Sequence, residues 1–77
     1  MEKFVIFISP SKGESGYLSS YVSSDVYSKA STLDNAMTYA SVADAMVHAI
    51  SIGEKFSIIR VKVTVCAEDV VYVGLGH

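Results

Sequence analysis

The order of apolar and polar residues along the chain predicts several short strands and one helix. Residues 2–9 form a run of strand-forming side chains that is apolar on both faces, which indicates a central strand or a sheet with an oligomer partner on one side. Residues 9–16 contain Pro10 and two glycines and predict a hairpin connection. Residues 56–66 alternate as a strand, and residues 70–75 predict the last strand, after a turn at residues 67–69.

The strand at residues 56–66 is expected to bury the side that carries its aliphatic residues. This expectation assigns Ile59, Val61, Val63 and Val65 to one face, and Arg60, Lys62, Thr64 and Cys66 to an outer face.

Residues 16–24 predict a strand in which tyrosine and serine alternate with other residues. One face then carries Tyr17, Ser19, Tyr21 and Ser23, and the other carries Leu18, Ser20 and Val22. If Leu18 and Val22 face the core, the tyrosines form an outward surface; the alternative is that Tyr17 and Tyr21 are buried. Residues 25–31 are expected to continue as irregular or edge-strand structure around Val26 and Tyr27.

The signals for the helix lie in residues 41–53. Ser41 is a suitable N-cap, Asp44 follows three positions later, and Gly53 occupies the place of a left-handed C-terminal residue. The expected helix, residues 42–51, has a wide apolar stripe suited to packing on a sheet. A short turn is expected before it at residues 33–37.

The order strand, strand, helix, strand, strand predicts an α+β fold. We expect one domain, residues 1–77, with a small and mostly antiparallel sheet and the amphipathic helix on one of its faces. A chain of 77 residues has a thin core. The first and last strands are apolar on both sides, whereas one helix covers only one face, so we expect a homodimer, with a partner protein as the second possibility.

Composition narrows the functional classes. The net charge is −2 and no basic run is present, which disfavours general nucleic-acid binding. No apolar stretch reaches the roughly 18 residues that span a bilayer, so no membrane association is expected. Cys66 is the only cysteine, and a reduced thiol in the cytoplasm is the favoured interpretation.

Candidate catalytic and metal-binding chemistry is weak. The possible metal ligands Cys66, His48 and His77 show no paired spacing, and we expect no metal and no other cofactor. Asp44 and His48 share a helix face and could form an orienting pair, but a solvated polar face has the same pattern. The glycines of residues 9–16 lack phosphate-loop spacing. We therefore expect no catalytic residues and no enzyme activity.

Two binding hypotheses follow from the tyrosines, because tyrosine and serine are favoured in recognition surfaces. The first is a protein-binding face with nearby loop residues, made of Tyr17, Ser19, Tyr21, Ser23, Tyr27, Lys12 and Glu14. The alternative is RNA or DNA binding, in which bases stack on a sheet face, through Tyr17, Tyr21, Arg60 and Lys62.

Residues 33–61 resemble a segment of small accessory proteins encoded by bacteriophages. The similarity lies in Leu33-Asp34-Asn35-Ala36, in Tyr39-Ala40-Ser41, in Ala45 and Ala49 of the helix, and in the strand from Phe56. The resemblance implies a protein that binds and inhibits, or redirects, one host protein. We therefore expect a modulator or inhibitor that occludes a site on a host or defence protein, in the cytoplasm of the host cell. It assigns no functional residue.

Overall fold

The computed structural model describes residues 3–61 and 67–74 and confirms the α+β class. The described elements are β1 (Lys3–Ile8), β2 (Gly16–Ser23), β3 (Val26–Ala30), the 3-10 turn η1 (Leu33–Asn35), α1 (Val42–Ile52), β4 (Phe56–Val61) and β5 (Ala67–Gly74). The expected edge structure around Val26 is a regular strand, β3, so the sheet has one strand more than the predicted order.

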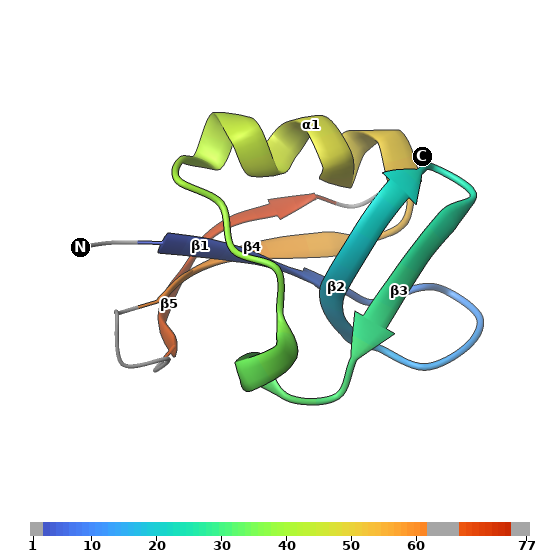
Figure 1. Cartoon of the computed structure of the whole chain (residues 1–77), viewed down its shortest axis with the longest axis horizontal. Helices are drawn as coiled ribbons and strands as arrows, with labels where there is room; N and C mark the ends of the chain where they lie inside the picture. Colours follow the sequence, from blue (N-terminus) through green and yellow to red (C-terminus); the bar gives the residue numbers. More distant parts are fainter. Residues whose placement is uncertain (1–2, 62–66, 75–77) are drawn as a thin grey trace.

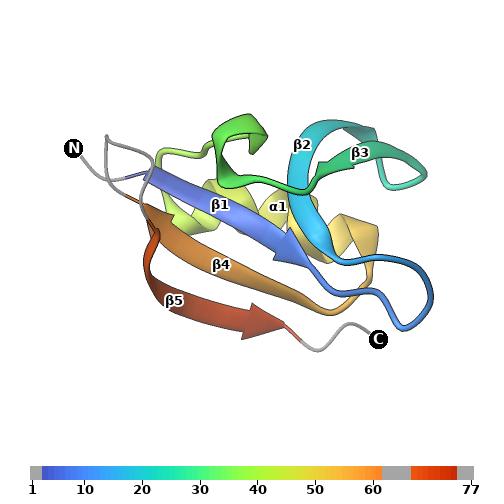
Figure 2. The same cartoon turned by 90° about the horizontal axis from the view of Figure 1, so that it is seen from below.

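The strands form one antiparallel sheet with the order β3-β2-β1-β4-β5. Helix α1 crosses one face of this sheet (Figure 1), and the view from below shows the other face of β1, β4 and β5 (Figure 2). Strand β1 is central, which fits its apolar character on both sides.

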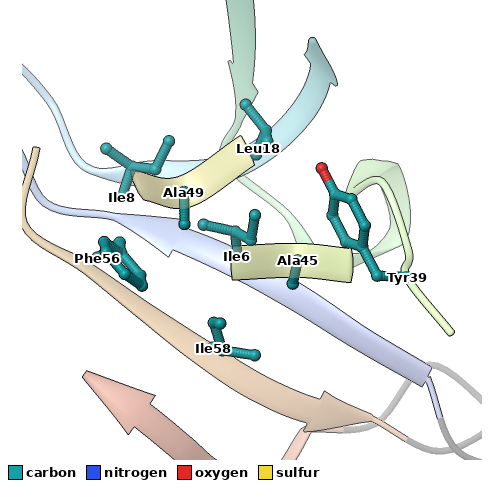
Figure 3. Packing of buried hydrophobic residues seen from close by; sticks show 8 residues of the cluster. All are labelled: Ile6, Ile8, Leu18, Tyr39, Ala45, Ala49, Phe56 and Ile58. Atoms are coloured by element: carbon teal, nitrogen blue, oxygen red, sulfur yellow. The ribbon is translucent and has the colours of Figure 1, made fainter. Parts of the chain in front are cut away.

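The main core lies between α1 and the sheet (Figure 3). Its strand residues come from alternating positions of β1 and β4, where Ile6 pairs with Ile58 and Ile8 with Phe56. Ala45 and Ala49 are the buried residues of the helix, and their small side chains let α1 approach the sheet closely. The full cluster is Ile6, Ile8, Leu18, Tyr39, Ala45, Ala49, Phe56 and Ile58.

The predicted facing of β4 is wrong. Phe56 and Ile58 face the helix, and the unbroken β1–β4 register places Arg60 on that same face, opposite Phe4. The pattern was ambiguous because the second face also buries apolar side chains, at Val5 and Val61. The other predicted positions, Lys62, Val63, Thr64, Val65 and Cys66, lie outside the described residues.

Strand β2 runs beside β1 for a short distance and then leaves it. The β1–β2 ladder pairs Phe7 with Tyr17 and Ile8 with Gly16. Against β3, the register of β2 shifts between Leu18 and Ser20, where β2 has one extra residue. Such a bulge bends its strand and reverses the side to which later residues point.

Residues 37–39 lie between β1 and β2, where these two strands diverge. The N–H groups of Phe4 and Tyr39 each donate to the other's carbonyl, at 2.9 and 2.8 Å, and the Met37 N–H donates to the Leu18 carbonyl at 2.8 Å. Since β4 occupies the other edge of β1, Tyr39 replaces β2 in the ladder at this end of the sheet.

The helix boundaries agree with the capping signals. The Asp44 N–H donates to Ser41 Oγ at 3.1 Å, and Gly53 has φ 78°, the left-handed conformation expected after the helix. The predicted turn at residues 67–69 is wrong, because β5 begins at Ala67 and pairs with β4 along its length.

We expect Gly74→Ala to lower the free energy of unfolding by about 1–3 kcal/mol. Gly74 is buried opposite Phe56, and a Cβ atom there would overlap the Phe56 ring. Urea denaturation monitored by circular dichroism measures the loss. The double variant Gly74→Ala/Phe56→Leu should show a smaller loss than the sum of the single variants, and strict additivity would contradict the overlap.

Candidate functional site

Helix α1, strand β2 and the segment that leads into α1 meet through four side chains, which we call the aromatic junction: Tyr21, Tyr39, His48 and Ser51. The Tyr21 ring stacks on the His48 imidazole with centroids 3.9 Å apart and planes 18° apart. The Tyr21 hydroxyl and Ser51 Oγ share a hydrogen bond of 2.7 Å. The Tyr39 hydroxyl lies 2.6 Å from His48 Nδ1. These contacts join the helix, β2 and the linking segment.

Local structure explains why these side chains meet. His48 and Ser51 are three positions apart and share one side of α1. Tyr21 follows the bulge of β2, which turns it toward that side, whereas regular alternation would group it with Tyr17. Tyr39 is fixed by its paired backbone hydrogen bonds with Phe4.

Burial controls the protonation of Tyr39. Its side chain is buried, and desolvation together with the nearby Tyr21 raises the pKa of its hydroxyl from 10.0 to about 12. The hydroxyl therefore stays protonated over the ordinary pH range and is available to donate to His48 Nδ1. In that arrangement the neutral imidazole carries its proton on Nε2.

The Asp44–His48 pair considered from the sequence is not the arrangement found. His48 Nδ1 bonds to Tyr39, and the residue is half-buried, not part of a fully solvated polar face. Asp44 is exposed and its backbone N–H contributes to the helix cap. Ser51 Oγ bonds to Tyr21 and not to the imidazole, so the junction does not form a serine–histidine pair. The contacts of the junction instead hold α1 against β2.

The predicted tyrosine and serine surface is divided by the bulge. Tyr17 packs edge-on against Phe7, with ring centroids 5.0 Å apart, on the sheet face opposite α1. Tyr21 contacts α1, and Tyr27 pairs with Tyr21 and packs against the main core. The prediction that Tyr17 and Tyr21 share one face is therefore wrong, although both belong to the described sheet.

The remaining predicted binding residues are spread over the molecule. Ser19 is half-buried and Ser23 is exposed near the hairpin turn. Lys12 and Glu14 are exposed in the β1–β2 loop, at the other end of β2 from Ser23. These loop residues and the hairpin turn do not form one continuous patch.

The four residues of the nucleic-acid hypothesis are not brought together. Tyr17 and Tyr21 lie on opposite faces, and one face of the Tyr21 ring is occupied by His48. Arg60 is in β4, and Lys62 lies outside the described residues. The described part of this hypothesis therefore provides no common stacking surface.

Sequence reasoning missed a group of exposed aliphatic side chains. Val22 is 77% exposed, Val47 69% and Ile50 56%. Val47 and Ile50 are three positions apart on α1, and Val22 follows Tyr21 in β2, beside the aromatic junction. We call Tyr21, Val22, Val47, Ile50 and Ser51 the hairpin–helix surface. The missed signal was that Asp44 is the only charged residue of α1.

Pockets, metal-ligand clusters and membrane-spanning helices are the other features of the described residues that would indicate a function. An open polar depression is lined by Glu14, Ser15, Lys29, Ala30 and Ser31, and the Lys29 ammonium donates to the Glu14 carbonyl at 2.7 Å. Among residues 3–61 and 67–74, no three histidine, cysteine, aspartate or glutamate side chains gather as metal ligands. No helix in the same ranges is long and apolar enough to cross a membrane.

Comparison with known proteins gives no assignment. No protein-family model matches the chain, and neither the curated proteins nor the solved structures give a significant match. The functional argument therefore depends on the residues and their geometry.

The raised pKa of Tyr39 predicts a loss of stability in alkali. The unfolded state begins to release this proton near pH 10, whereas the folded state holds it until about pH 12. The free energy of unfolding should therefore be unaffected by Tyr39 below pH 10 and fall between pH 10 and 12. We expect the fall to exceed that of Tyr39→Phe by on the order of 1–2 kcal/mol. Parallel urea titrations at pH 8, 10 and 12 test this, and equal slopes for both proteins would contradict it.

Replacing His48 should open the aromatic junction. We expect His48→Ala to reduce the free energy of unfolding by about 1–3 kcal/mol, because Tyr21 loses its stacking partner and the buried Tyr39 hydroxyl loses its hydrogen bond. Denaturation with guanidinium gives the difference. Val47→Ala, at an exposed position of the same helix, is the matched control, and a similar loss in both variants would contradict a role for the junction.

Proposed function

We propose that this protein is a non-catalytic interaction module that binds a partner protein through its hairpin–helix surface. The observation that carries the proposal is the exposure of Val22, Val47 and Ile50 on adjoining elements of a very small domain. Val47 and Ile50 are neighbours on the exposed side of α1, and exposed aliphatic residues that lie together are typical of protein–protein contact sites.

The chemistry of the surface defines the partner. Apart from Asp44, the helix offers no charge to a partner, so an uncharged and apolar surface fits it best. Tyr21 and Ser51 supply hydroxyl groups beside the aliphatic residues, although each already bonds the other. The aromatic junction holds the hairpin against α1, which limits the ordering cost of binding.

Occlusion is the mechanism that fits such a surface. A surface that acts by covering a site on its partner needs no pocket or catalytic group of its own. The resemblance of residues 33–61 to bacteriophage accessory proteins favours a host or defence protein as the target, in the host cytoplasm. Nucleic-acid binding has less support, because the described residues proposed for it do not share a face.

The test compares polar variants of two exposed sites in pull-downs from nuclease-treated bacterial lysate. Val47→Gln/Ile50→Gln removes aliphatic surface, and glutamine is a good helix former, so the fold should persist. We expect a partner captured by the wild type to be bound roughly tenfold more weakly by this variant. Val73→Thr, at a position 49% exposed on β5, is the control and should bind normally.

The other outcomes are informative in different ways. Equal capture by the double variant and the wild type would exclude the hairpin–helix surface. Nucleic acid that is recovered without nuclease and released by salt would favour the alternative function.

A further inference from the structure

The sheet has two edges, formed by β3 and β5. An edge strand pairs along one side and presents a row of backbone N–H and C=O groups on the other. In proteins that remain monomeric, such edges are usually blocked by bulges, proline or a covering segment. The two edges of this sheet differ in that respect.

Strand β5 is irregular, whereas β3 is regular. In the β4–β5 ladder, the extra residues at both register shifts, Glu68 and Val71, belong to the edge strand itself. In the β2–β3 ladder, the extra residues are Ser19 and Val22, and both belong to the inner strand β2. Strand β3 therefore runs through its five residues without a bulge or proline. It is the edge better suited to accept another strand.

We propose that β3 pairs antiparallel with β3 of a second copy of this chain, about a two-fold axis at Ser28. In this register Ser28 faces Ser28 of the second copy, and Tyr27 faces Lys29. Val26, which is 56% exposed, faces Ala30. The sheet then continues from one protomer into the other, with both α1 helices on the same side.

Chemical complementarity selects a second copy as the occupant. Tyr27 and Lys29 are two residues apart and lie on the same face of β3. The two-fold register sets each lysine ammonium beside the tyrosine ring of the other copy, a cation–π arrangement that occurs twice. Asp25, at the hairpin turn, lies diagonal to that lysine, so opposite charges also meet.

The hydrogen bond already made by Lys29 is compatible with this pairing. Its ammonium donates to the Glu14 carbonyl, and an ammonium has three N–H donors. The dimer would also add backbone hydrogen bonds and buried surface to a domain whose core is thin. This inference uses the β3 edge and does not depend on the hairpin–helix surface.

Disulfide trapping tests the register. In a Cys66→Ser background, Ser28→Cys should form a dimer under mild oxidation, because directly opposed residues in antiparallel strands have Cα atoms about 4.5–5.5 Å apart. Ser20→Cys is the matched control: it is exposed and pairs with Ser28, but it lies on the inner strand, so its copies would be roughly 14 Å apart. Equal trapping of both variants, or none at Ser28→Cys, would overturn the proposal.

Sedimentation equilibrium of the untrapped proteins supplies a second measurement. We expect a dimer for the wild type, and a dissociation constant roughly fivefold to tenfold higher for Lys29→Glu. Asp25→Lys/Lys29→Glu should recover part of the affinity, because the exchange restores opposite charges across the axis. A wild-type monomer at concentrations up to about 100 µM would overturn the dimer, whereas the hairpin–helix surface could still bind its partner.

Discussion

The departure of β2 from β1 is the constraint on which the rest of the structure depends. After Phe7 and Ile8 have paired, β2 turns away, and the backbone groups on that edge of β1 need other partners. The segment through Tyr39 provides them with two hydrogen bonds to Phe4. These hydrogen bonds hold the segment that leads into α1 between β1 and β2. The position of that segment determines where the helix begins above the sheet.

The aromatic junction follows from that arrangement. Tyr39 belongs to the segment before α1, and Tyr21 belongs to the bent strand β2. His48 of the helix contacts both of them. The imidazole of α1 thus contacts both β2 and the segment that leads into the helix. The hairpin is joined to β1 through a short ladder, so its position relative to α1 relies strongly on these contacts. Because the hairpin is held in place, the exposed aliphatic residue of β2 keeps a defined position relative to those of α1.

The surface of the molecule is uneven in a way that suits association. The outer side of α1 exposes valine and isoleucine where a solvated helix normally carries charge. One sheet edge is irregular and the other is regular. In a chain of 77 residues, each of these features leaves apolar or hydrogen-bonding groups that association with another chain would cover.

Local sequence signals were enough to predict most of the individual elements, because capping and alternation act over a few neighbouring residues. The cap at Ser41, the left-handed Gly53, the strand β1 and the α+β class were all predictable from such signals. The face of β4 that meets the helix and the directions of the β2 tyrosines depend instead on contacts between distant elements. Both faces of β4 carry aliphatic residues, so its own alternation does not show which face is turned to the helix. The register with β1 determines that face. The bulge after Leu18 depends on contacts with β3 and α1, which no local pattern encodes.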